Sequence, residues 1–346
     1  MTVAEKPSLS SSDSLGILDR PAWPGRRHVL DLDDFSVGEI LAVLDTAAAM
    51  KEILSRPVKK LPTLRGKTIV TMFYEASTRT RVSFEVAAKI LGADAVNVTA
   101  STSSATKGES LIDTVRTLRA IGADIVVMRH PQSGAPWVAA DQVDSSVING
   151  GDGWHAHPTQ ALLDVFTVRE TLGRVKDVKV TILGDILHSR VARSAAWAFT
   201  KLGAELTFCG PPTLMPRSWV ADPASMPWPA RVCERVEDGL AGADVVMTLR
   251  LQRERQSGGL IGSLREYSRQ YGLSQERLRL TRDSALVMHP GPMNEGVEIA
   301  PDVARGAQSV IEQQVTNGVA IRMALLYLLS TGSMAADSSD RLAEVV

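Results

Sequence analysis

The sequence contains few cysteines and no long apolar run, and each absence excludes a class of protein. Its 346 residues include two cysteines, Cys209 and Cys233, too few for a disulfide framework and without the spacing of a zinc site. Free thiols of this kind fit a reducing compartment. No stretch approaches the roughly 18 consecutive apolar residues of a membrane-spanning helix. We therefore expect a cytoplasmic protein that has no membrane partner.

An excess of charge of either sign is also missing. Lysine and arginine total 38 against 39 for aspartate and glutamate, so nothing indicates a nucleic-acid partner. The N-terminus lacks the apolar core of a signal peptide. Arg26-Arg27 resembles a twin-arginine signal, but the acidic residues 31–34 follow it instead of an apolar stretch. Residues 1–24, rich in serine, proline and charge, are predicted to form a mobile extension.

The chain does contain a regular alternation of strand and helix patterns. Its length favours two domains, and its 44% of hydrophobic residues can fill a large core. The expected strands are 67–74, 95–100, 123–130, 145–150, 178–185, 204–211, one within 236–250, and 285–292. The expected helices are 36–54, 78–91, 110–122, 159–173, 189–203, one within 236–250, and 308–332. This alternation predicts an α/β fold of two domains, each a mostly parallel sheet flanked by helices.

Residues 77–81, Ser-Thr-Arg-Thr-Arg, lie where the first expected strand ends and a helix begins. The segment is either a capped turn with solvated arginines or a site for an anion. A helix N-terminus offers free N–H groups and partial positive charge, and Arg79 and the hydroxyls add donors suited to phosphate. Arg79 and Arg81 stand two positions apart and face different ways, so only one is expected to touch a ligand.

Two further polar residues follow expected strands of the first half. Arg129 ends a buried strand, where an arginine is costly unless it is paired or bound, so it forms a rim salt bridge or holds a ligand. His157 could be a metal ligand, an acid–base group, a satisfied loop histidine or a neutral donor to a substrate carbonyl. His155 lies two positions away, but no acidic or cysteine partner completes a zinc pattern.

In the second half, Arg190 and Arg250 follow separate strands, and two such arginines suit two carboxylates. Pro290 and Pro292 form either a rigid turn or a loop that aims backbone carbonyls at a ligand. The glycines required by a dinucleotide fingerprint or a P-loop are missing around Gly184 and before Lys107. No catalytic Ser/His/Asp set, Cys/His pair or carboxylate pair stands out. Arginines, a histidine and hydroxyls predict a site that stabilises negative charge.

Seven motifs occur in an order that resembles the catalytic chains of aspartate carbamoyltransferases, in the transcarbamoylase superfamily. They are STRTRVSFE, KGESLIDT, MRHP, HPTQALLD, GD…SR…RS, LRLQRER and HPGP, and the resemblance covers about residues 27–330. It implies transfer of a carbamoyl group from carbamoyl phosphate to L-aspartate in pyrimidine biosynthesis, without a metal or organic cofactor. It also implies a homotrimer with shared active sites, and possible association with regulatory or dihydroorotase subunits.

The resemblance further implies a division of the chain and of the roles in its site. Residues 25–158 with 317–346 would bind carbamoyl phosphate, and residues 159–316 would bind aspartate. The implied catalytic residues are Arg79, Thr80, Lys107, Arg129 and His157. Phosphate and carbamoyl contacts would come from Ser77, Thr78, Arg79, Thr80, Arg129, His157 and Gln160, with Ser103 and Lys107 reaching into the neighbouring subunit. Aspartate contacts would come from Arg190, Arg250, Gln252, Pro290 and Gly291, and domain closure from Glu75 pairing with Arg190 and Arg255.

Two alternatives remain at this point. Ornithine carbamoyltransferases share the phosphate motif, and a relative could use another amino acid, but ornithine enzymes normally read HCLP where this chain reads HPGP at 289–292. Two arginines fit an anionic acceptor and would repel a cationic one. A non-catalytic scaffold should have lost Arg79, Arg129 or His157, and all three are present. The chain departs from many relatives at Thr106, in place of a second lysine, and at Glu295, in place of an arginine.

Overall fold

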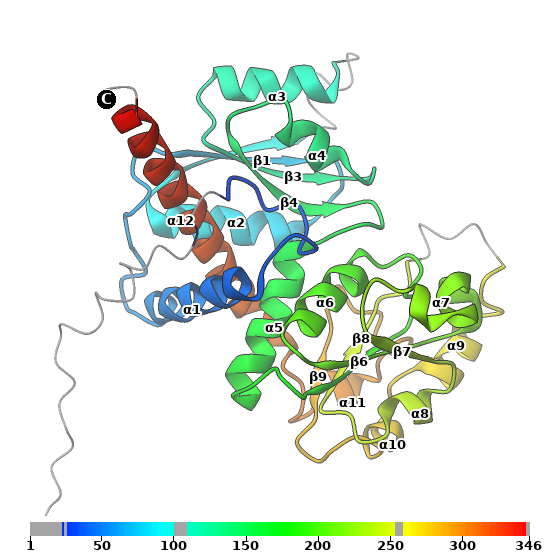
Figure 1. Ribbon diagram of the computed structural model, residues 1–346. Helices are drawn as coiled ribbons and strands as arrows, with labels where there is room; N and C mark the ends of the chain where they lie inside the picture. Colours follow the sequence, from blue (N-terminus) through cyan, green and yellow to red (C-terminus); the bar gives the residue numbers. More distant parts are fainter. Residues whose placement is uncertain (1–22, 24–25, 100–108, 253–258, 344–346) are drawn as a thin grey trace, which may run out of the picture.

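The computed structural model describes residues 23, 26–99, 109–252 and 259–343, with the backbone alone for residue 99 and for 332–343. Two separate parallel sheets form the centres of two units (Figure 1). Helices cover the sheets, and the carboxyl ends of both sets of strands lead toward the region between the units. No helix in the described ranges combines the length and apolar character needed to cross a membrane.

The first sheet has four parallel strands in the order β2-β1-β3-β4. Its strands are β1 (Thr68–Phe73), β2 (Asp94–Thr99), β3 (Ile125–His130) and β4 (Ser146–Asp152). The helices of this half are α1 (Val37–Leu54), α2 (Thr78–Leu91), α3 (Leu111–Ala120), α4 (Ala135–Ala140) and α5 (Pro158–Leu172). β1 and β3 are buried along most of their length, as expected for parallel strands covered on both faces.

The second sheet has five parallel strands in the order β7-β6-β5-β8-β9. Its strands are β5 (Lys179–Leu183), β6 (Glu205–Cys209), β7 (Ala230–Cys233), β8 (Val245–Thr248) and β9 (Leu286–Met288). The helices are α6 (Arg190–Lys201), α7 (Arg217–Ala221), α8 (Val236–Leu240), α9 (Leu264–Tyr271), α10 (Gln275–Leu278) and α11 (Pro301–Ala304), with 3-10 turns at Pro212–Leu214 and Pro223–Ser225.

The last helix, α12 (Ile311–Ala343), returns the chain to the first unit. It packs against α1, α2 and α5, so both ends of the described chain contribute to one half of the molecule (Figure 1). Its buried face carries an apolar run from Ala320 to Leu329, interrupted by the buried Arg322. The expected helix 308–332 is confirmed, although the helix continues further than its apolar pattern.

The two-unit α/β prediction is confirmed, and most expected elements occur within a few residues of their predicted bounds. α1 begins after Ser36, whose hydroxyl accepts a hydrogen bond from the Glu39 N–H in a capping box. Six short helices and strands were not expected: α4, α7, α9, α10, α11 and β7. β7 is a four-residue edge strand that is only half-buried, so it lacks the apolar run by which a buried strand is recognised.

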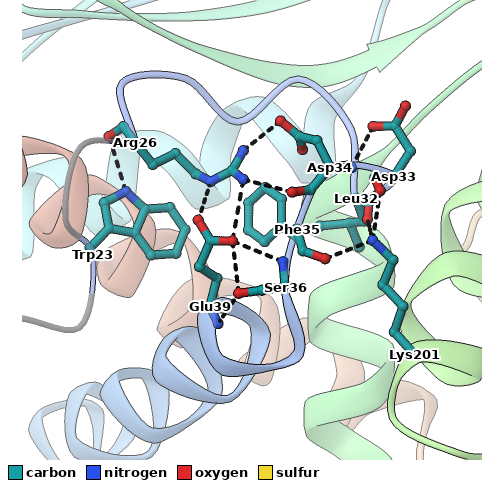
Figure 2. A network of polar contacts seen from close by, with 9 residues as sticks. All are labelled: Trp23, Arg26, Leu32, Asp33, Asp34, Phe35, Ser36, Glu39 and Lys201. Atoms are coloured by element: carbon teal, nitrogen blue, oxygen red, sulfur yellow. Dashed lines mark hydrogen bonds and ion pairs between the residues drawn. The ribbon is translucent and has the colours of Figure 1, made fainter.

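Residues 26–36 form a strap across the two units. Val29 pairs with β4 of the first sheet, donating its N–H to the Val147 carbonyl and accepting from the Asn149 N–H. At the other end, the Lys201 ammonium of α6 donates to the carbonyl oxygens of Leu32, Asp33 and Phe35 at 2.8, 2.7 and 2.6 Å (Figure 2). The strap therefore joins the edge of one sheet to a helix of the other unit.

The paired arginines 26 and 27 have a structural explanation in this strap. The Arg26 guanidinium lies 3.9 Å from the Phe35 ring centroid and pairs with Glu39 at 2.7 Å and Asp34 at 2.8 Å, as Figure 2 shows. Arg27 pairs at the surface with Asp144. Of the acidic residues that directly follow the arginines, Asp34 is thus a partner of Arg26.

Candidate active site

A cavity of about 710 Å³ lies where the carboxyl ends of the two sheets approach each other. Every predicted site residue that the structure describes lines it: Glu75, Ser77, Thr78, Arg79, Thr80, Arg129, His157, Gln160, Arg190, Arg250, Gln252, Pro290 and Gly291. Ser103, Lys107 and Arg255 lie outside the described residues. Ligands of parallel α/β sheets bind in this position, so the convergence marks a ligand site.

One end of the cavity, here called the hydroxyl end, consists of Ser77–Thr80 at the start of α2. Ser77 is the N-cap residue, but among the described residues its side chain makes no capping hydrogen bond. The hydroxyls and the first N–H groups of α2 therefore face the cavity as donors. Within the described lining Arg79 is present and Arg81 is not, so a single arginine of this segment reaches the cavity.

The opposite wall, here called the arginine end, consists of Arg190, Arg250, Gln252, Pro290 and Gly291. It meets the hydroxyl end where Gly291 lies against Arg79. A Cβ at Gly291 would stand 3.1 Å from the Arg79 Cζ, and the residue has a φ of +65°, so glycine satisfies two constraints here. The loop after β9 is thereby fixed against the arginine of α2.

Glu75 joins the two units through arginines. Its Oε2 accepts a hydrogen bond from Arg190 at 2.7 Å and lies 3.2 Å from the Arg129 Nε. Arg190 belongs to α6 and Arg129 to β3, so one carboxylate holds cations from both sheets. The Arg190 and Arg129 side chains also fill the space beside Gly151, where a Cβ would lie 3.1 and 3.3 Å from their atoms. The expected pairing of Glu75 with Arg190 is present, whereas its pairing with Arg129 was not foreseen.

His157 is buried at the N-cap of α5, and its backbone N–H donates to the Ser194 hydroxyl at 2.9 Å. Burial, together with the positive charges of Arg129, Arg190 and Arg322, holds the pKa of His157 well below its usual range. The imidazole is therefore neutral at physiological pH, and in this form one ring N–H can still donate to a carbonyl oxygen. Within the described residues, no three or more histidine, cysteine, aspartate or glutamate side chains gather as a metal ligand set.

Two models of one family match the chain. The carbamoyl-P binding domain of aspartate/ornithine carbamoyltransferases matches residues 27–170, and the Asp/Orn binding domain matches residues 176–329. The chain belongs to the aspartate/ornithine carbamoyltransferase family. A family member from Roseiflexus sp. (strain RS-1), named aspartate carbamoyltransferase catalytic subunit, is 62% identical over 308 residues, covering 88% of this chain and 95% of the relative. A chain of the same name from Chloroflexus aurantiacus is 58% identical, covering 88% and 98%.

Solved structures of this carbamoyltransferase family show the same fold. Aspartate transcarbamoylase from Trypanosoma cruzi in complex with carbamoyl phosphate is 30% identical with a TM-score of 0.80, covering 90% of this chain and 99% of that one. Ornithine carbamoyltransferase from Pyrococcus furiosus is 30% identical with a TM-score of 0.77, covering 87% and 96%. Both acceptor classes thus share the architecture of this chain, and the choice between them rests on the arginine end and on the named relatives.

The prediction missed three buried polar residues beneath the carbamoyltransferase cavity. Asp164 of α5 accepts hydrogen bonds from Gln160 at 3.0 Å and from Gln314 at 2.7 Å, and burial raises its pKa to about 7. Arg322 lines the cavity with 4% of its surface exposed, and burial lowers its pKa to about 10. The sequence did carry one signal for Arg322, because a charged residue inside the apolar run of α12 is rare without a partner or a ligand.

Two other features lie apart from the site. A more open cavity of about 880 Å³ between α8 and α9 is larger, but it contains none of the predicted site residues. Its charges are partly paired, with Arg277 at 3.5 Å from Glu237.

Glu295, the departure after the HPGP segment, pairs with Arg305 at 2.6 Å and is not among the described residues that line the site cavity. This substitution therefore belongs to the surface near the site.

Proposed function

We propose that the chain transfers the carbamoyl group of carbamoyl phosphate to the amine of L-aspartate, giving N-carbamoyl-L-aspartate and phosphate for pyrimidine biosynthesis. One observation carries the proposal. An anion site at a helix N-terminus, a neutral histidine and two arginines from the other unit line a single cavity. Its occupants would be carbamoyl phosphate on the side of residues 25–158 and 317–346, and aspartate on the side of residues 159–316.

At the hydroxyl end, Ser77, Thr78, Arg79 and Thr80 hold the phosphate group of carbamoyl phosphate. The N–H groups of α2 and the helix dipole favour the dianion, and the Arg79 fork adds charge-assisted hydrogen bonds. Arg322 lies behind the same cavity and raises the positive potential further. The phosphate is thereby held both before and after it becomes the leaving group.

At the centre, Arg129, His157 and Thr80 polarise the carbamoyl oxygen, and Gln160 holds the carbamoyl amide. The aspartate nitrogen attacks the carbamoyl carbon and a C–N bond forms. Negative charge develops on the oxygen, the C–O bond to phosphate breaks, and phosphate leaves with the proton released by the amine. Each donor to such an oxyanion typically contributes about 3–4 kcal/mol of transition-state stabilisation. Orientation of the two reactants supplies a further contribution of roughly 7–11 kcal/mol.

At the arginine end, Arg190, Arg250 and Gln252 bind the carboxylates of aspartate, while the carbonyls of Pro290 and Gly291 orient the amine. Glu75 pairs with Arg190, and Arg255 would complete this latch when the units close on the substrates. The ion pair preorganises Arg190 for binding aspartate, because the Glu75 carboxylate already holds one edge of the Arg190 guanidinium.

Further parts of the proposal concern assembly and location. We propose a cytoplasmic homotrimer in which Ser103 and Lys107 act in the neighbouring subunit's site, with regulatory or dihydroorotase chains as possible further partners. Exposed valines on α2 and on the edge strand β2 support a contact between subunits: Val82, Val86 and Val96 are 44%, 38% and 46% exposed.

Mixing Lys107→Ala with Arg79→Ala chains should restore part of the activity, since hybrid trimers contain an intact shared site. No recovery after proven subunit exchange would refute the shared site.

The decisive assay measures phosphate release from carbamoyl phosphate with aspartate or with ornithine as acceptor. The proposal predicts turnover with aspartate and none above background with ornithine, and mass spectrometry should identify N-carbamoyl-L-aspartate. Turnover with ornithine alone would replace the proposed acceptor while keeping the carbamoyl-phosphate half of the reaction. Turnover with neither amino acid would reject the proposed function.

A further inference from the structure

A chain of polar contacts runs from a half-exposed imidazole to the backbone of His157. His155 Nε2 lies 3.9 Å from Asp31 Oδ2. The other carboxylate oxygen of Asp31 accepts a hydrogen bond from the Ser194 hydroxyl at 3.2 Å. The same hydroxyl accepts the N–H of His157 at 2.9 Å. Three segments far apart in the sequence, namely the strap, α6 and the turn before α5, therefore meet through one serine and one carboxylate.

Asp31 is an unusual residue to find in this place. It is only 4% exposed, and its neighbours on the strap are held on both sides by β4 and by Lys201. A buried carboxylate costs free energy unless cations and hydrogen bonds compensate for the lost water. A strap that served only as packing would be more stable with an apolar residue here. The retained carboxylate therefore points to a role in orienting the groups that it contacts.

The contacts explain which groups Asp31 would orient. His157 is the N-cap residue of α5, so the direction of its backbone N–H fixes the start of that helix. Ser194 lies one turn beyond Arg190 on α6. A single hydroxyl, oriented by Asp31, thus sets the position of the central histidine relative to the helix that carries an arginine of the opposite wall.

The His155 imidazole, 3.9 Å away, supplies a positive charge to this carboxylate when it is protonated. Its ring also lies 3.4 Å from the buried Asp152 of β4 and packs edge-on against Trp137 of α4. The other charges that act on the pair are Asp33 and the Lys201 ammonium. An imidazole between two buried carboxylates is favoured in its protonated form, so it serves as a counter-ion that disappears at alkaline pH.

The pKa values of His155 and Asp31 are both raised in the folded chain. The contact with Asp152 raises the pKa of His155 above 6.5, and burial raises the pKa of Asp31 from 3.8 to about 6. A group whose pKa is higher in the folded chain stabilises the fold most below its unfolded pKa, and this contribution is lost as the pH rises through the folded value. The ion pair itself needs an ionised Asp31 and a protonated His155, so it exists only between about pH 6 and the raised pKa of His155.

We propose that Asp31, acting through Ser194, is a positioning residue for His157, and that the His155 imidazolium is its counter-ion. The inference deepens the proposed carbamoyl transfer and rests on it. Nothing in it requires Asp31, Ser194 or His155 to touch a substrate. Its effect on the reaction is geometric, because a small displacement of the donor to the carbamoyl oxygen lowers the rate of the chemical step.

The test compares Asp31→Ala, Asp31→Asn, Ser194→Ala and His155→Asn with the unaltered chain. Asp31→Ala and Ser194→Ala should lower kcat about tenfold or more, with little change in the KM for carbamoyl phosphate, because the lost geometry matters in the transition state. Asp31→Asn keeps an acceptor oxygen and should lose less. Faster hydrogen exchange at the first amides of α5 in Asp31→Ala, without global unfolding, would show the loosened helix start directly.

Two further readouts separate positioning from a merely structural role. The kcat of His155→Asn relative to the unaltered chain should be lowest above about pH 6, where Asp31 is ionised, and below the histidine's raised pKa, where the ring is still protonated. It should approach unity at higher pH, where the neutral ring no longer acts as counter-ion. In an Asp31→Asn background, His155→Asn should lower kcat less than it does in the unaltered chain, because only the charge of Asp152 then remains for the imidazolium to balance.

Asp34→Asn serves as the matched control, since the Asp34 side chain is 63% exposed on the same strap, pairs with Arg26 and should leave kcat unchanged. Asp31→Asn and Asp31→Ala chains that fold and match this control in kcat would overturn the inference. So would a pH-independent effect of His155→Asn. An unaltered chain without turnover of aspartate would reject the proposed function itself, and the exchange measurement would then still report whether Asp31 holds α5.

Discussion

The hydroxyl end and the arginine end of the cavity are built in opposite ways. Four consecutive residues at one helix start, Ser77–Thr80, make the hydroxyl end, and backbone N–H groups supply part of its charge. The arginine end gathers side chains from α6 and from the segments after β8 and β9. The first is a local structure that exists once α2 forms, whereas the second exists only when the second unit has folded and faces the first.

This difference has a mechanical consequence. The hydroxyl end cannot move relative to α2, since its donors are the helix itself. The arginine end is held to the first unit by Glu75, which contacts Arg190 and Arg129 together. Phosphate recognition should therefore be insensitive to the relative position of the units, and acceptor recognition should depend on it.

The largest effect is expected at the hydroxyl end. Arg79→Ala removes the only arginine of this segment that lines the described cavity, and kcat/KM for carbamoyl phosphate should fall by roughly 100- to 1,000-fold, as on loss of one oxyanion-type donor. Steady-state kinetics with calorimetric melting would show that the fold survives. Arg81→Ala is the matched control and should remain near-normal. Equal losses in the two variants would contradict the assignment of Arg79 to the ligand.

A smaller loss, which spares the binding of phosphate, is expected from Glu75→Gln, because Glu75 contacts Arg190 and Arg129 and no residue of Ser77–Thr80. Charge-assisted hydrogen bonds contribute about 1.5–3 kcal/mol, so the kcat/KM for aspartate should fall about tenfold or more. Binding of inorganic phosphate alone, measured by titration calorimetry, should change little. Glu85→Gln, which pairs with Lys89 on α2, provides the control. If phosphate binding weakened as much as aspartate use, the two ends would not be separable.

Asp164, which lies beneath the cavity, should make the free energy of unfolding depend on pH. The pKa of Asp164 is about 7 in the folded chain against 3.8 ordinarily, so its contribution to stability is greatest below pH 3.8 and is lost as the pH rises through about 7. In Asp164→Asn the free energy of unfolding should fall less steeply as the pH rises across this window. The difference in slope should correspond to at most one proton bound by the folded chain. Denaturant titrations from pH 4 to 8 would measure the slope. Parallel slopes for both chains would refute a buried, titrating Asp164.

The smallest effect should come from Arg26, at the start of the strap, where a change leaves the cavity alone. Arg26→Lys loses the planar contact with Phe35 and the fork on Glu39, and should lower the free energy of unfolding by about 1 kcal/mol. Arg27→Lys, at an exposed pair, should be unchanged within error. Denaturant unfolding checks both variants, and kcat should be normal in each. An unaltered stability for Arg26→Lys would show that Figure 2 depicts a surface contact of no energetic value.

The same contrast explains what the sequence could predict. The hydroxyl end was found from five adjacent letters, since a strand end, three hydroxyls and an arginine at a helix start have a direct physical meaning. The arginine end needed the resemblance to a family, because nothing local says that Arg190 and Gln252 face one ligand. Asp31, Asp164 and Arg322 escaped both approaches. Their importance comes from burial and from partners on distant segments, such as Gln314 for Asp164, which only the folded chain reveals.

The edge strand β7 was not predicted for a different reason. β7 has a residue pattern too short and too polar to stand out, and its pairing with β6 decides its conformation. In contrast, α1 was predictable from its cap and spacing, because Ser36 and Glu39 form the start signal within the helix's own sequence. A helix start that is encoded within a few adjacent residues can be predicted from the sequence, whereas a strand that depends on pairing with a distant segment cannot.

The position of α12 has a consequence for the order in which the protein is made. Arg322 and Gln314 lie in the last helix, yet they complete a cavity whose anion site begins at Ser77. Because synthesis and domain folding proceed from the N-terminus, the hydroxyl end and even the whole second sheet emerge before the floor of the site does. A chain cut short before Arg322 would carry most of the substrate contacts and still have an incomplete cavity. The cavity is therefore complete only after α12 has been synthesised and has packed against the first unit.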